Sequence, residues 1–144
     1  MIVKIKNSFF CILGNMLPPP INKYFYLFGG VNFKNIRSVW IGFGTYIDHV
    51  NPNLIFIESE VCISLKCIIL THYDSTISIK NPKIKSYSKP VKIGMKTYIG
   101  ASTLIMPGVK LGKNCFVNSF SLLTKSFDDN SFIMGHPAKL VKKI

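Results

Sequence analysis

Aliphatic residues recur at every sixth position over most of the chain. A period of six fits neither an amphipathic helix nor a simple alternating strand over this length. It does fit a repeat architecture in which each six-residue unit is a short strand followed by a turn. The positions are Ile41 and Ile47, then Ile57, Ile63 and Ile69, then Ile93, Ile99, Ile105, Leu111, Val117 and Leu123.

The neighbouring positions support the same repeat. Glycine follows the aliphatic residue at Gly42, Gly94, Gly100 and Gly112, where we expect a sharp backbone turn that glycine tolerates. Small or β-branched residues lie four places after the aliphatic ones and fit beside them in a narrow core. Three units close one coil, which predicts coils at 57–74, 93–110 and 111–128 and a partial coil at 41–52. The small residues are Thr45, Val61, Cys67, Thr97, Thr103, Val109, Cys115 and Ser121.

The repeat divides the chain into segments. Residues 1–30 are predicted to form a helical cap, and residues 31–144 the β-domain, with a C-terminal tail at 129–144. Residues 75–92 are polar and rich in lysine, and they match the six-residue repeat poorly. We therefore expect a protruding loop, and long loops of this kind often serve function. The alternative is one irregular coil, since 18 residues make one full turn of such a repeat.

Composition and charge limit which binding partners and which cellular compartment we expect. The 144 residues fit one domain, and the net charge of +12 favours a polyanion, whether nucleic acid, an anionic membrane or a phosphorylated cofactor. No zinc-finger, helix-turn-helix or RNP-like pattern accompanies the charge, so nucleic acid is not favoured. Membrane-surface contact through the amphipathic cap is a weak additional option. The four cysteines form no C-x-x-C pair, so we expect no metal site and a reduced, cytoplasmic protein.

A set of short motifs resembles the hexapeptide-repeat acetyltransferases, which include galactoside, maltose, xenobiotic and polysaccharide O-acetyltransferases. The resemblance covers roughly residues 39–144. It implies an all-β, left-handed parallel β-helix, a homotrimer with active sites between subunits, and acetyl-CoA as co-substrate. It is carried by the segments 92–101, 105–109, 123–125 and 135–139, which read KIGMKTYIGA, IMPGV, LTK and GHPAK.

The acetyl-transfer chemistry that the resemblance implies requires a base near the acceptor hydroxyl, and histidine suits this task. His72 ends a coil just before the long loop, at a cleft rim, and family members carry their catalytic histidine in this place. Asp74 is a candidate to orient its imidazole, and Asp48 and Tyr73 are candidates to bind the acceptor. Two of these residues have a plainer alternative: an exposed turn histidine for His72 and a solvated carboxylate for Asp74.

The cofactor site is implied by the same resemblance. Tyr98 stands where the family usually has Trp and flanks the pantetheine, although a core or interface role competes. Lysine side chains can bind the CoA phosphates as point charges. The predicted CoA contacts are Tyr98, Gly100, Ala101, Ser119, Thr124, Lys125, Lys139 and Lys142.

The sequence therefore favours a sugar O-acetyltransferase, with surface-polysaccharide biosynthesis as the expected role. Two alternatives stay open. One is an N-acetyltransferase acting on a nucleotide-linked amino sugar, which the positive charge would suit equally well. The other is a trimeric β-helix scaffold without catalysis. The identity of the acceptor sugar does not follow from the sequence.

Overall fold

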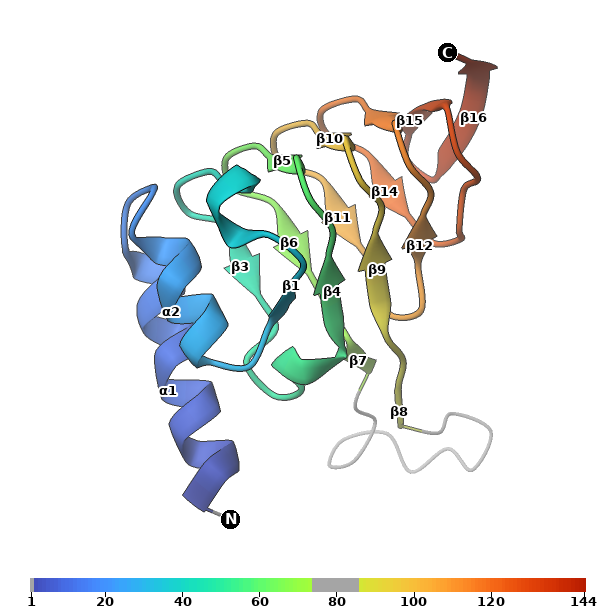
Figure 1. Cartoon of the computed structure of the whole chain (residues 1–144). Coiled ribbons are helices and arrows are strands. Elements are labelled where there is room, and N and C mark those ends of the chain that lie inside the picture. The colour runs from blue at the N-terminus through green and yellow to red at the C-terminus, as the bar shows by residue number, and fades with distance from the viewer. Residues whose placement is uncertain (1, 74–85) are drawn as a thin grey trace.

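The computed structural model describes residues 2–73 and 86–144, with two helices at the N-terminus followed by short strands (Figure 1). Helix α1 spans Ile2–Met16 and helix α2 spans Asn22–Phe28. Two short 3-10 turns follow, η1 (Ile36–Ser38) and η2 (Pro52–Leu54). Neither helix of the described chain is long and apolar enough to cross a membrane.

Three sheets of mainly parallel strands, here called A, B and C, make up most of the β-structure. Sheet A consists of β1 (Asn32–Phe33), β4 (Ile55–Ile57), β9 (Val91–Ile93) and β12 (Lys110–Leu111). Sheet B begins with β2 (Trp40–Ile41), β5 (Cys62–Ile63), β10 (Tyr98–Ile99) and β13 (Phe116–Val117). Sheet C consists of β3 (Tyr46–Ile47), β6 (Ile68–Ile69), β11 (Leu104–Ile105) and β14 (Leu122–Leu123).

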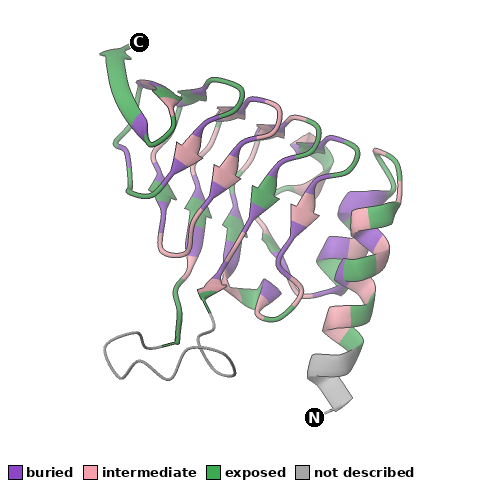
Figure 2. Cartoon of the chain, turned by 180° about the vertical axis from the view of Figure 1, so that it is seen from behind, coloured by how far each residue is buried: buried purple, intermediate pink, exposed green. Residues whose placement is uncertain are grey.

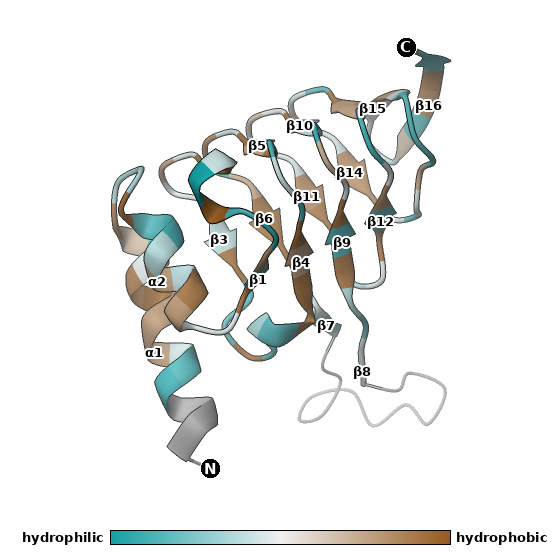
Figure 3. Cartoon of the chain, in the orientation of Figure 1, coloured by the Kyte–Doolittle hydropathy of each residue, from teal (hydrophilic) through white to brown (hydrophobic). Residues whose placement is uncertain are grey.

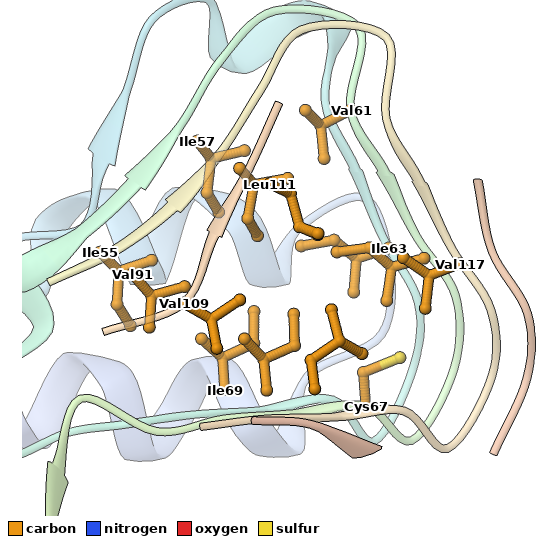
Figure 4. Close-up of a cluster of buried hydrophobic side chains, with 14 of the residues drawn as sticks. Ile55, Ile57, Val61, Ile63, Cys67, Ile69, Val91, Val109, Leu111 and Val117 are labelled. Atoms are coloured by element: carbon orange, nitrogen blue, oxygen red, sulfur yellow. The ribbon is translucent and has the colours of Figure 1, made fainter. Parts of the chain in front are cut away.

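The chain visits the three sheets in the order A, B, C four times. On each return it pairs in register with the strand of the previous visit, so that Ile93 lies beside Leu111 and Ile105 beside Leu123. Each visit therefore forms one three-sided rung, and the rungs stack with their aliphatic residues inside (Figures 2 and 4). All eleven repeat residues from Ile41 to Leu123 are buried, as the six-residue period predicts.

The small residues of the repeat are buried as well, and their polar atoms find partners within the stack. Thr45 Oγ1 donates to the carbonyl of Ser64 at 3.0 Å, and Thr97 Oγ1 donates to that of Gly112 at 3.0 Å. A buried hydroxyl without a partner would destabilise the core, so these bonds explain why threonine fits at these positions.

The glycines of the repeat serve close packing between rungs, not an unusual backbone conformation. A Cβ built on Gly94 would lie 2.3 Å from the carbonyl oxygen of Gly112 in the next rung. The left-handed backbone conformation occurs instead two residues later, as at Lys96 (φ 58°) and Ser102 (φ 57°). The predicted turn glycines are thus present for a different reason, because the next rung leaves no room for a side chain.

We expect Gly94→Ala to lower the free energy of unfolding by about 2–3 kcal/mol, because backbone atoms of the next rung cannot move aside as a side chain would. Urea unfolding of the purified chain measures the change. Lys96→Gly is the matched control in the same turn, and it should leave stability unchanged or slightly raised because glycine adopts positive φ freely. Equal stability of Gly94→Ala and the wild type would contradict this account of packing.

The helices cover the open end of the first rung. On this side the backbone carbonyl groups of the first rung have no neighbouring rung to bond to, and side chains of α2 donate hydrogen bonds to them instead. The bonds run from Asn22 Nδ2 to Ile41, from Lys23 Nζ to Val39 and from Tyr26 Oη to Thr45, at 2.9–3.0 Å. From α1, Asn15 Oδ1 accepts from the Ile47 amide at 2.9 Å. Buried backbone groups require such partners, so the helices close the sheet edges.

The structure departs from the prediction in the two segments that were expected to lie outside the repeat, the loop at 75–92 and the tail at 129–144. Residues 75–85 of the predicted loop lie outside the described residues. Its last two residues, Val91 and Lys92, do not protrude, since they belong to β9, where Val91 is buried against Ile55 of β4. The tail at 129–144 extends sheet B, because β15 (Ser131–Gly135) pairs parallel with β13 and β16 (Ala138–Lys143) returns antiparallel to it.

Candidate active site

His72 begins β7 (His72–Tyr73), at the corner where the second rung passes from sheet C towards sheet A. Its Nδ1 lies 2.6 Å from Oδ2 of Asp48, which comes from the same corner of the first rung. The two residues meet because Ile47 pairs with Ile69, so the residues after each strand are stacked. The imidazole remains 27% exposed, whereas the Asp48 side chain is fully buried.

Asp48 is held by three further hydrogen bonds. Its Oδ2 accepts from the amide and the hydroxyl of Thr71, at 2.8 and 2.6 Å, and its Oδ1 accepts from the Val50 amide at 2.9 Å. Burial alone would raise the pKa of Asp48, but the hydrogen bonds from Thr71, Val50 and His72 outweigh it, so the pKa lies below its usual value. The carboxylate is therefore ionised at neutral pH.

An ionised Asp48 fixes the tautomer of His72. A carboxylate only accepts hydrogen bonds, so the proton of the neutral imidazole lies on Nδ1 and the lone pair lies on Nε2. Nε2 can then accept a proton from a bound molecule, and Asp48 stabilises the imidazolium that results. The geometry suits a general base.

Asp48, a predicted acceptor residue, is buried beneath His72, and its carboxylate is bonded to Val50, Thr71 and His72, so its position suits orientation of the imidazole. The residue proposed to orient the imidazole, Asp74, lies outside the described residues. The signal for Asp48 was present in the sequence: it follows Ile47 directly, one rung before the segment that carries His72.

His72 opens into a pocket of about 390 Å³. Tyr73 and Tyr87 stack within it, with ring centroids 5.9 Å apart, because β7 pairs antiparallel with β8 (Tyr87–Ser88). Asn51 Nδ2 donates to Ser88 Oγ at 3.2 Å across the pocket. Tyr73 was among the predicted acceptor residues, whereas Tyr87 was not. The pocket is lined by Val50, Asn51, His72, Tyr73, Ser86, Tyr87 and Ser88.

The predicted CoA residues fall into three groups within one chain. Tyr98, Gly100, Ala101 and Ser119 form a strip along β10 and the corner between sheets B and C, where Gly100 packs against the Ser119 backbone. Tyr98 stacks on Phe116 with ring centroids 4.9 Å apart.

The other predicted CoA residues lie elsewhere. Thr124 and Lys125 follow β14, at the same corner as His72 but two rungs further along. Lys139 and Lys142 are exposed on β16, at the far end of sheet B. Sheet C separates the strip from the corner of His72, so one chain does not bring all of these residues together.

Further hollows lie away from His72, on the outer face of sheet A. One, of about 520 Å³, contains Phe56, Lys92 and Met95, and another contains Lys110 and Lys143. Among residues 2–73 and 86–144, no three His, Cys, Asp or Glu side chains are grouped as a metal site would require.

Comparisons with known proteins agree with this architecture. Residues 90–125 match the family model described as bacterial transferase hexapeptide (six repeats). The galactoside O-acetyltransferase of Lactococcus lactis subsp. lactis (strain IL1403) is 29% identical over 118 residues, which are 81% of this chain and 56% of that protein. The putative acetyltransferase YvoF of Bacillus subtilis (strain 168) is 33% identical over 64% of this chain and 52% of its own length. The chain thus spans about half the length of these relatives.

Solved structures resemble the whole chain. A maltose O-acetyltransferase from Clostridium difficile 630 matches with a TM-score of 0.69 at 17% identity, covering 99% of this chain and 88% of that one. A galactoside acetyltransferase in complex with coenzyme A matches with a TM-score of 0.64 at 17% identity, covering 98% and 80%. The chain thus carries the hexapeptide repeat of the matched family model, and it resembles hexapeptide-repeat acetyltransferases in sequence and in fold.

Proposed function

We propose that the protein transfers an acetyl group from acetyl-CoA to a sugar hydroxyl, with His72 as general base. The observation that carries the proposal is the 2.6 Å contact between His72 Nδ1 and the buried Asp48 carboxylate, beside an open pocket. Galactoside and maltose O-acetyltransferases among the relatives and structural neighbours support a sugar acceptor. A role in surface-polysaccharide biosynthesis belongs to the same proposal.

In the proposed reaction, His72 Nε2 accepts the proton of the acceptor hydroxyl as its oxygen attacks the thioester carbonyl. The carbon–sulfur bond then breaks, the CoA thiolate leaves, and the imidazolium returns the proton to the sulfur. Asp48 stabilises the imidazolium throughout. Backbone N–H groups at Gly100 and Ala101 are the proposed donors to the developing oxyanion.

We further propose a homotrimer of left-handed β-helices, because one chain separates His72 from the strip formed by Tyr98, Gly100, Ala101 and Ser119. In a trimer, the strip of one subunit can face the corner of its neighbour, and acetyl-CoA would lie between them. Lys125, Lys139 and Lys142 supply positive charge for its phosphates, and the Thr124 hydroxyl can donate a hydrogen bond to a phosphate oxygen. The four free cysteines fit a reduced compartment, for which we propose the cytoplasm.

The acceptor is proposed to bind against the stacked pair of Tyr73 and Tyr87, since aromatic rings offer apolar faces to the C–H groups of a sugar. We expect Tyr87→Ala to raise the KM for the acceptor about tenfold, with little change in the KM for acetyl-CoA, because ring contacts contribute about 1 kcal/mol or more. Tyr24→Ala, an equally exposed tyrosine on α2, is the matched control. An unchanged acceptor KM in Tyr87→Ala would place the acceptor elsewhere.

The positive charge of the chain also supports a second class of acceptor, a nucleotide-linked amino sugar. The net charge is +12, and Lys89 Nζ lies 5.2 Å from the centre of the Tyr87 ring, beside the pocket. These features suit an amino sugar attached to a nucleotide diphosphate, to which the enzyme would transfer acetyl on nitrogen. One solved neighbour is an N-acyltransferase from Bacillus cereus in complex with dTDP and 3-hydroxybutyryl-CoA (TM-score 0.61, 18% identity).

Release of CoA thiol from acetyl-CoA, measured with a panel of free sugars, glycosides and nucleotide-linked amino sugars, tests both acceptor classes. An ester product is cleaved by mild base, and an amide product is not. We expect base-labile product from a sugar with free hydroxyls. If no acceptor in the panel releases CoA above the rate of hydrolysis, the enzyme proposal fails and a β-helix scaffold is favoured.

A further inference from the structure

The outer face of the helical layer is apolar although it faces solvent. On α1, Phe9, Ile12 and Met16 are 57%, 44% and 70% exposed. They lie three or four residues apart and so share one side of the helix. The buried residues Cys11 and Gly14 lie on the opposite side, towards the β-structure.

Helix α2 repeats this arrangement. Its buried residues Asn22 and Tyr26 bond to the first rung, so the opposite side points away from the β-structure. That side carries Tyr24, Leu27 and Phe28, of which Phe28 is 61% exposed. The brown segments of α1 and α2 in Figure 3 lie next to each other, and the two helices are packed together. The apolar sides of both helices therefore form one surface at the end of the stack.

Charge around this surface has a single sign. Residues 1–47 contain five basic residues and no acidic one, since Asp48 is the first carboxylate of the chain; of the five, Lys23 is buried against the first rung. Lys6 is exposed on α1, on the same side as Phe9. Aromatic and aliphatic side chains bordered by lysine are the features of helices that lie flat in the interface of an anionic bilayer.

We propose that the α1–α2 face, formed by Phe9, Ile12, Met16, Tyr24, Leu27 and Phe28, docks on an anionic membrane surface. The charge favours this occupant over a second copy of the chain, because two copies meeting through this face would bring their Lys6 side chains together, and neither helix has a carboxylate to pair them. The proposal goes beyond acetyl transfer and does not depend on it. The docked end carries the first rung, so His72 in the second rung would lie near the membrane.

Co-sedimentation with vesicles tests the docking face without any acetyl-CoA. The full chain is mixed with vesicles of phosphatidylcholine alone or of equal parts phosphatidylcholine and phosphatidylglycerol. We expect binding to the anionic vesicles that weakens at high salt, and little binding to the neutral ones. Absence of binding to the anionic vesicles would overturn the proposal.

Variants then locate the surface. Phe9→Gln with Met16→Gln should reduce binding to anionic vesicles at least tenfold, because glutamine keeps the helix and removes the apolar contact. Phe120→Gln is the control, since Phe120 is 74% exposed on a corner of the fourth rung, far from the helices. Thermal unfolding verifies that each variant is folded. Equal loss in the control, or a double variant that binds like the wild type, would refute the assignment. So would a double variant whose main change is dissociation of an oligomer.

Discussion

Replacing His72 by Asn is expected to lower kcat/KM for acetyl transfer by about 10²–10⁴-fold, the usual contribution of general base catalysis. The effect should fall on kcat, because the asparagine side chain leaves the pocket open but cannot accept the proton of the hydroxyl. Steady-state release of CoA thiol measures it, with an acceptor identified from the panel of sugars.

His49 provides the matched control for this variant. It follows Asp48 at the same corner of the first rung, but its Nδ1 lies 2.7 Å from the Tyr46 hydroxyl, so its partner is not the Asp48 carboxylate. His49→Asn should therefore retain acetyl transfer within a few-fold of the wild type. If His72→Asn retains activity, or if the two variants lose it equally, His72 is not the base.

Replacing Asp48 by Asn should lower kcat about 100-fold, as loss of a residue that orients a functional histidine commonly does. The amide carries no charge to stabilise the imidazolium, while the pocket and the predicted CoA residues are unchanged. The KM for acetyl-CoA should therefore stay close to that of the wild type. Asp128→Asn, an exposed carboxylate at the far end of the stack, is the control. An equal kcat in Asp48→Asn would leave the buried carboxylate without a role in the reaction.

The same substitution has a consequence for stability that depends on pH. The pKa of Asp48 is lower in the folded protein than its usual value, so the carboxylate stabilises the fold at pH above that usual value. This contribution is lost as the pH falls through the folded pKa, in the acid range. Asp48→Asn should lower the free energy of unfolding at pH 7 by about 2 kcal/mol. Its stability should also fall less steeply with acid, which urea unfolding from pH 7 to pH 3 measures.

The core of the fold was predictable from residue spacing alone. Each residue of the six-residue period is buried, because the spacing fixes which side chain points inward in every rung. The chemical reason for the glycines was not predictable in the same way. Contact between the backbones of Gly94 and Gly112 depends on how closely successive rungs approach, and spacing along one chain does not report that distance.

The candidate site was predictable in part. The position of His72 at a corner follows from its place after Ile69. Its contact with Asp48 depends on the rungs pairing Ile47 with Ile69, across a partial coil whose connection to the next is irregular. Tyr87 was missed because it follows a polar segment without period, where no rule based on spacing assigns a partner to Tyr73.

The most direct test of the proposed reaction is a crystal structure of the protein with CoA and an acceptor sugar. We predict that the CoA sulfur and one sugar hydroxyl lie within about 4 Å of His72 Nε2, as a reactive arrangement requires. The pantetheine should run along Tyr98 and Ser119 of a neighbouring copy. A CoA sulfur on the outer face of sheet A, or a His72 ring turned away from both ligands, would contradict the proposal.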